Sequence, residues 1–142
     1  MGVVVNLDED RTKKSSLDAL KSCVADDLKA VNQLILRRMD SQVDLVPQLA
    51  GHIIVAGGKR LRPLLTLGAA KLCQYTGDRH ISLATCVEFI HTATLLHDDV
   101  VDESHLRRGQ ETANALFGNQ ASVLVGDFLY SRCKKVIVRF RI

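Results

Sequence analysis

Apolar residues recur along the chain at three- and four-residue steps, and this spacing predicts helices. The clearest stripe lies near the start of the chain and consists of Leu17, Leu20, Val24, Leu28, Val31 and Ile35. Either Ser15 or Ser16 can cap the helix that carries this stripe, which we predict to run to about Met39. Residues 1–14 are predicted to form a flexible arm that precedes one domain over residues 15–132.

Glycine and proline divide the rest of the chain into further helices. Gly57-Gly58 ends the second helix, and Pro63 begins a third that Gly77-Asp78 closes. The predicted helices after the first cover about residues 45–56, 63–76, 81–102, 112–117 and 119–130. Polar residues 103–110 predict a loop. The fold class is therefore all-α, a helical bundle.

The last residues differ in pattern from the rest of the chain. Residues 136–142 alternate between apolar and basic side chains, which favours a strand over a helix. We therefore treat residues 133–142 as an atypical tail that follows the domain.

Composition and charge exclude several classes of protein. A net charge of +3 over 142 residues, without a long basic cluster, does not favour nucleic-acid binding. No apolar run reaches the roughly 18 residues that a transmembrane helix needs. The four cysteines are spaced neither as a zinc clip nor as a disulfide framework, so a reducing cytoplasm is the simplest setting.

An acidic cluster follows the apolar run of the 81–102 helix. The string His97-Asp98-Asp99-Val100-Val101-Asp102-Glu103 places Asp98 and Asp102 four residues apart, on one face of a helix. Two stacked carboxylates repel each other unless a cation lies between them, and Mg²⁺ binds one or two carboxylates together with substrate phosphates. The alternative is a solvated acidic helix end. The apolar run before the cluster argues against a solvated helix end, because such a run predicts that these carboxylates are buried.

Two basic clusters complement the carboxylates. Lys59, Arg60 and Arg62 follow Gly57-Gly58 on a glycine-rich turn, from which Lys59 and Arg62 can converge on one anion. Arg107-Arg108 lies in the polar loop five residues after Asp102. Arginine offers forked donors and lysine a point charge, and both suit phosphate. Each cluster alone is typical of a solvated surface. Together with the carboxylates, they fit a site for two polyanionic substrates, one bound through a metal and one directly.

These motifs resemble those of a known family. The strings GGKRLRP, FIHTATLLHDDVVDES, RRG, TANALFGN and SVLVGDFLYSR are similar to those of the trans-type polyprenyl diphosphate synthases, in particular the bacterial octaprenyl diphosphate synthases of ubiquinone biosynthesis. The resemblance covers roughly residues 23–132. It implies the isoprenoid synthase helical bundle, truncated here to its N-terminal helices, and usually a homodimer.

The resemblance also implies roles for individual residues. Asp98 and Asp102 bind Mg²⁺ that holds the allylic diphosphate, with farnesyl diphosphate as the expected primer. The residues implied to bind isopentenyl diphosphate are Lys59, Arg62, His91 and Arg108. Arg107 contacts the allylic substrate. Ala93, five residues before Asp98, leaves the product tunnel open, which implies a long-chain product.

The chain also departs from the family pattern. The second aspartate-rich motif, expected to hold a further Mg²⁺, does not occur in these 142 residues. We therefore expect a truncated chain, through a frameshift near Cys133 or a misdrawn gene end, with little or no activity.

Two other functions compete with a prenyltransferase. The first is a non-catalytic fragment or a partner subunit of a hetero-oligomer. The second is an HD-type metal phosphohydrolase, in which His97-Asp98 supplies the dyad and His52, His91 and His105 supply further ligands. The phosphohydrolase leaves both basic clusters unexplained.

Overall fold

The computed structural model describes residues 15–55 and 58–139, and within them the chain is almost entirely helical. The elements are α1 (Ser16–Cys23), α2 (Ala25–Met39), α3 (Leu45–Val55), α4 (Leu61–Leu72), α5 (Arg79–Val101), β1 (Leu106–Arg107), β2 (Gln110–Glu111), α6 (Ala113–Phe117) and α7 (Asn119–Arg139). The predicted all-α class is confirmed. None of the described helices combines the length and apolarity that crossing a membrane requires.

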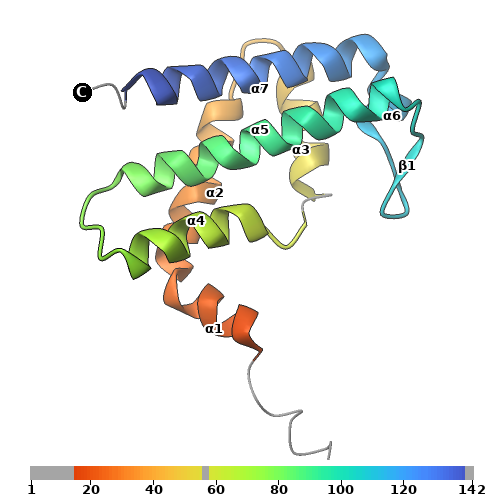
Figure 1. Ribbon diagram of the computed structural model, residues 1–142. Helices are drawn as coiled ribbons and strands as arrows, with labels where there is room; N and C mark the ends of the chain where they lie inside the picture. The colour runs from red at the N-terminus through yellow and green to blue at the C-terminus, as the bar shows by residue number, and fades with distance from the viewer. Residues whose placement is uncertain (1–14, 56–57, 140–142) are drawn as a thin grey trace, which may run out of the picture.

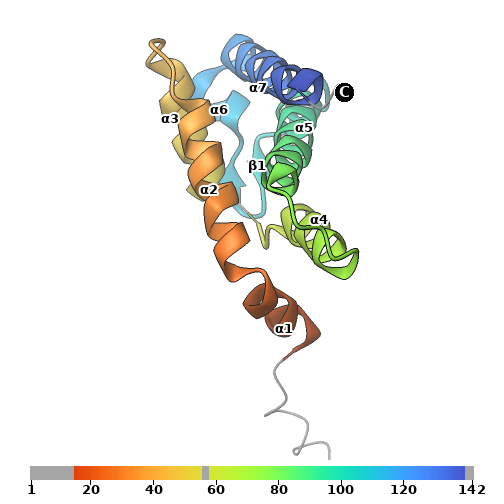
Figure 2. The same cartoon turned by 90° about the vertical axis from the view of Figure 1, so that its left-hand side faces the viewer.

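Helix α5 occupies the centre of the fold. It lies alongside α7, α4 packs against it, and α2 crosses it (Figure 1). Turned by 90°, the fold shows α2 and α3 on one side and α4, α5 and α7 on the other, with α6 and β1 between them (Figure 2). The residues of the core with no exposed surface include Val31, Leu49, Leu64, Ala93 and Leu129. This packing fixes the direction of α5, whose last turn carries the acidic cluster.

The predicted first helix is two helices, because the chain leaves helical geometry at Val24. Its φ is −119° and its ψ is 20°, although its N–H still donates to the carbonyl of Leu20. Val24 is buried, so the apolar stripe passes through the break. Periodicity follows the stripe and cannot detect a change at one residue.

The third predicted helix begins and ends earlier than expected. Helix α4 starts at Leu61 and ends at Leu72. Pro63 is therefore its third residue, where the missing N–H is one of the first four that have no partner within a helix. Gln74, just beyond the helix, has a φ of 54° and ends it before Gly77 is reached.

The prediction of a strand after residue 136 is wrong for the described part of the tail. Helix α7 continues through Arg139, and residues 140–142 lie outside the described residues. Leu129, Cys133 and Val136 are all buried, at steps of four and three residues. This helical spacing turns one face of α7 toward α5. Burial of that face stabilises the helix, although apolar and basic residues alternate over the short segment that follows residue 136.

The loop predicted over residues 103–110 contains a small hairpin. Strands β1 and β2 pair antiparallel, with Arg107 opposite Gln110. Arg108 and Gly109 form the turn and have φ values of 53° and 78°. Positive φ at both central residues is the requirement of a type I′ turn, whose twist matches paired strands. The hairpin therefore holds the two arginines at a tight turn.

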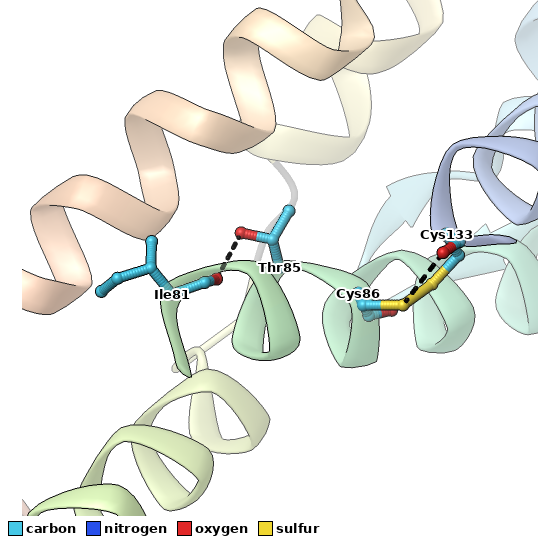
Figure 3. Close-up of a disulfide and its surroundings, with 4 residues drawn as sticks. All are labelled: Ile81, Thr85, Cys86 and Cys133. Atoms are coloured by element: carbon cyan, nitrogen blue, oxygen red, sulfur yellow. Dashed lines mark hydrogen bonds between the residues drawn. A yellow bond between two sulfur atoms is a disulfide. The ribbon is translucent and has the colours of Figure 1, made fainter. Parts of the chain in front are cut away.

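Two of the four cysteines form a disulfide, contrary to the sequence prediction. Cys86 on α5 is bonded to Cys133 on α7, and both are buried (Figure 3). Thr85 directly precedes Cys86 on α5, and its hydroxyl donates to the carbonyl of Ile81. The two cysteines are 47 residues apart, so only the packing of α5 against α7 brings them together. Cys23 and Cys73 are free and exposed.

This arrangement predicts a difference in reactivity among the cysteines. In the oxidised native chain, iodoacetamide should modify Cys23 and Cys73 and leave Cys86 and Cys133 unmodified, because the disulfide has no thiol to alkylate. Peptide mass mapping of the alkylated protein checks the sites. Prior reduction and unfolding should expose all four. Alkylation of Cys86 or Cys133 in the native oxidised chain would contradict the pairing.

Candidate functional site

A cavity of about 400 Å³ lies among α3, the start of α4, α5 and the hairpin. Five of the residues predicted to bind substrate line it: Lys59, Arg62, His91, Arg107 and Arg108. These residues come from three segments that are far apart in the sequence. The fold therefore brings both predicted basic clusters and the predicted histidine into one concave, cationic site.

The two basic segments are in direct contact. A Cβ atom placed on Gly58 would overlap the guanidinium of Arg108, whose Nη2 and Cζ would lie 3.1 and 3.2 Å from it. Glycine at this position therefore allows the arginine to lie against the backbone of the turn. Arg108 and the cations that follow Gly58 are thus held on the same side of the cavity.

Asp99 and Arg107, which both line the cavity, form an ion pair. Arg107 Nη2 donates to Asp99 Oδ1 at 2.6 Å, and Nε lies 3.2 Å from each carboxylate oxygen. The Asp99 side chain is 7% exposed and that of Arg107 is 43% exposed. The hydrogen bond from Arg107 to Asp99 raises the pKa of Arg107, and the charges of Asp98 and Asp102 add to this. One buried carboxylate therefore holds a guanidinium that is partly open to solvent.

The buried member of the acidic cluster is Asp99, and the expectation that Asp98 and Asp102 are buried is wrong. Both of these side chains are exposed, and neither lines the cavity. Asp102 ends α5, and its N–H donates to the carbonyl of Asp98 at 2.8 Å, so the two are one helical turn apart as predicted. Solvent access suits a metal ion that keeps several waters and binds through one or two carboxylates.

His91 is held in an electropositive environment. Its pKa is lowered from the ordinary value of 6.5, first by burial and then by the charge of Arg62. Arg107 and Arg108 act in the same direction, and Glu88 opposes them. The neutral ring, which carries one N–H donor, is therefore the favoured form at neutral pH. That donor can serve an anion without adding a positive charge.

Replacing Arg62 by leucine should raise the pKa of His91, because the largest charge that disfavours the protonated ring is removed. Histidine ring titration by NMR measures the change, with Arg38→Leu on α2 as the control. An unchanged or lower His91 pKa in Arg62→Leu would contradict the assignment.

The lowered pKa of His91 also predicts how stability depends on pH. Because the His91 pKa is lower in the folded chain than in the unfolded chain, the unfolded chain binds more protons as the pH falls below about 6.5. Acidification through that range should therefore lower the free energy of unfolding.

Further polar contacts, which the sequence did not predict, hold the hairpin and the turn after α5. Asn114 Nδ2 donates to the carbonyls of Asp99 and Ser104 at 3.3 and 3.1 Å. The Thr112 hydroxyl donates to the same Ser104 carbonyl at 2.7 Å, and His52 Nε2 lies 3.0 Å from the carbonyl of Glu111. The string TANALFGN contained two of these residues but gave no sign of their partners. They fix the hairpin that presents Arg107 and Arg108.

The metal-ligand set of a phosphohydrolase does not assemble here. Between residues 15 and 139, omitting 56–57, no group of three or more His, Cys, Asp or Glu side chains is placed to hold a metal ion. His97 lies 3.6 Å from Asp127 Oδ1 and 3.3 Å from the carbonyl of Val123, so its ring faces α7. The dyad proposed for the phosphohydrolase is therefore directed away from the cavity.

Comparison with known sequences identifies relatives of this chain. A family model described as polyprenyl synthetase matches residues 43–141. The octaprenyl diphosphate synthase of Escherichia coli (strain K12) is 53% identical over 117 residues, which are 82% of this chain and 36% of that protein. The all-trans-nonaprenyl-diphosphate synthase (geranyl-diphosphate specific) of Rhodobacter capsulatus is 51% identical over 116 residues. The chain thus spans about a third of the length of these relatives.

Solved structures show the same helical arrangement. A decaprenyl diphosphate synthase from Rhodobacter capsulatus matches with a TM-score of 0.81 and 54% identity, over 87% of this chain and 38% of that one. A polyprenyl synthase from Caulobacter crescentus CB15, complexed with calcium and isoprenyl diphosphate, matches with a TM-score of 0.83 and 53% identity, over 89% and 39%. The second of these proteins binds both a divalent cation and a prenyl diphosphate.

Proposed function

Since the chain belongs to the polyprenyl synthetase family, we propose that it carries the isopentenyl diphosphate site and the first metal-binding motif of a trans-type, long-chain polyprenyl diphosphate synthase. The observation that carries this proposal is the cavity, where cations from two separate segments converge around a neutral histidine from a third. One diphosphate bears several negative charges on a compact group. Such a ligand offsets the mutual repulsion of these cations.

Within the cavity, isopentenyl diphosphate would be bound directly. Lys59, Arg62 and Arg108 supply charge, and His91 donates a hydrogen bond to a diphosphate oxygen. All four residues line the same 400 Å³ space, and none of them needs a metal to bind phosphate. In this proposal the isopentenyl double bond would extend toward the allylic substrate at the end of α5.

The allylic diphosphate would lie at that end, beside Arg107, Asp98 and Asp102. Two exposed carboxylates one turn apart are hard oxygen donors that suit Mg²⁺, which supplies charge to stabilise a departing diphosphate. Arg107 adds a fixed positive charge to the same oxygens, held in place by Asp99. Loss of the diphosphate leaves an allylic cation, which the isopentenyl double bond attacks before a proton is lost. These three steps, in that order, give the head-to-tail 1′-4 product.

The finer assignments follow from this function. Farnesyl diphosphate is the proposed primer, and a homodimer in the cytoplasm is the proposed form of the longer protein. Ala93, five residues before Asp98 on α5, is fully buried and does not line the cavity. The proposal of a long product rests on the small size of this side chain at a position that the family resemblance places beside the growing chain.

The test is prenyl transfer by the purified 142-residue chain with radiolabelled isopentenyl diphosphate, farnesyl diphosphate and Mg²⁺, together with calorimetric binding of isopentenyl diphosphate. Binding at micromolar to millimolar concentration is expected, and isopentenol is the control that lacks the diphosphate. Transfer would show that the first motif suffices for catalysis. Binding without transfer would assign this chain the substrate-binding half of the reaction. Absence of binding would refute the proposal.

A further inference from the structure

Arg60 differs from the two cations that flank it in the basic turn. Its Nη1 donates to Oε1 of Glu88 at 2.7 Å, and the two side chains are 16% and 11% exposed. Lys59 and Arg62, by contrast, are exposed residues. The middle cation of the turn is therefore already paired with a carboxylate of α5 and is largely removed from water.

Glu88 lies in the cavity beside His91, so its charge affects anion binding there. Glu88 lies three residues before His91 on α5, and both line the cavity. An unpaired carboxylate at this place would repel a diphosphate. The pair with Arg60 neutralises that charge and also ties the basic turn to the helix that carries His91. Neutralising Glu88 and tying the basic turn to α5 therefore both depend on the ion pair between Arg60 and Glu88.

The backbone of Arg60 shows why a tie is needed. Arg60 caps α4 with φ 53° and ψ 36°, the left-handed conformation that non-glycine residues rarely adopt. Its carbonyl accepts from the N–H of Leu64 at 3.0 Å, so the first turn of α4 depends on this conformation. A residue in this region persists only where its surroundings hold it. The buried ion pair is the contact through which the side chain holds it.

We propose that Arg60 is a positioning residue that acts through Glu88, and that the pair fixes Lys59 and Arg62 in the orientation that binds a diphosphate. The choice of diphosphate as the ligand rests on the proposed function. The positioning itself rests on the ion pair, the left-handed backbone and the shared cavity. Arg60 also lines the cavity, but its guanidinium is paired with Glu88 and so acts on the anion through the positions of Lys59 and Arg62.

The decisive variant is Glu88→Gln, because two accounts of the pair predict opposite signs. Removing a negative charge from the cavity and releasing a cation should strengthen anion binding if electrostatics alone decide. If the pair positions the turn, binding of inorganic pyrophosphate should instead weaken by about tenfold, the middle of the range for residues in one ion-pair network. Glu111→Gln, which removes the same charge from another cavity-lining residue, is the matched control and should bind as tightly as the unchanged chain or more tightly.

A double-mutant cycle and hydrogen exchange complete the test. Arg60→Gln combined with Glu88→Gln should lose no more affinity than either single change, since both remove one contact. The amide of Leu64, which donates to the carbonyl of Arg60 at 3.0 Å, should exchange faster in Glu88→Gln, while the amide of Leu129 in the core stays protected and shows that the fold is intact. Tighter pyrophosphate binding or unchanged exchange at Leu64 in Glu88→Gln would overturn the proposal. If the unchanged chain binds no pyrophosphate, the proposed function fails, and exchange alone decides the positioning role.

Discussion

Replacing Asp98 by asparagine should weaken the Mg²⁺-dependent binding of farnesyl diphosphate by about 100-fold or more. Asp98 is exposed and lies one helical turn before Asp102, so it can reach a hydrated cation without a change in the fold. Asparagine keeps the shape and one oxygen but removes the charge. Because the residue is exposed, the change should leave the free energy of unfolding within about 0.5 kcal/mol of its original value.

Calorimetric titration of farnesyl diphosphate, with Mg²⁺ and with EDTA, measures this effect. Glu103→Gln is the matched control, since Glu103 lies in the same acidic cluster and loses the same charge but is not assigned to the metal. Its binding should change by less than about threefold, as expected for an exposed charge screened by solvent and salt. Equal losses in Asp98→Asn and Glu103→Gln would show that the acidic cluster acts only through its total charge.

Most of the helices, and the cations that line the cavity, could be predicted from sequence because they follow from local pattern. Helices α5 and α6 lie where periodicity and the Thr112 cap placed them, and the Thr112 hydroxyl accepts from the N–H of Ala115. The cations of the cavity were identified from their residue types and their order along the chain. Their convergence in one cavity agrees with that prediction.

Local sequence pattern did not predict which carboxylate of the acidic cluster faces the cavity. His91 precedes Asp98 by seven residues, which on a helix places the two nearly on one face. At about 100° per residue, Asp98 lies about 20° from His91 around the helix, and Asp99 about 80° in the opposite sense. The cavity opens on the side of Asp99, which lines it together with Glu88. Periodicity gives the relative directions of side chains but does not say which direction faces the rest of the fold.

The contacts that hold the site depend on packing between distant segments. Arg60 and Glu88 are 28 residues apart, and Cys86 and Cys133 are 47 apart. Neither pair has a spacing that predicts contact, because each depends on how α4 or α7 lies against α5. The sequence could therefore name cations that line the cavity, but not the residues that hold them in place.

The ion pair between Asp99 and Arg107 should be the most sensitive of these supporting contacts. Replacing Arg107 by leucine leaves a carboxylate that is 7% exposed without its partner. We expect the free energy of unfolding to fall by about 1–3 kcal/mol, since a buried charged group then lacks its hydrogen bonds. Because Arg107 itself is 43% exposed, water can reach the vacated space, which places the expected loss below that of a fully buried pair.

Urea unfolding of four variants measures this contribution: Arg107→Leu, Arg108→Leu, Asp99→Asn and the double change of Arg107→Leu with Asp99→Asn. Arg108→Leu removes the neighbouring cation, which lies against Gly58, and should cost clearly less than Arg107→Leu. Combining Arg107→Leu with Asp99→Asn removes the stranded charge, so the double variant should be more stable than Arg107→Leu alone. If the double variant instead loses the sum of the two single changes, the two side chains are not coupled in solution. In that case the guanidinium of Arg107 is free to bind substrate without Asp99, and the buried carboxylate has another partner.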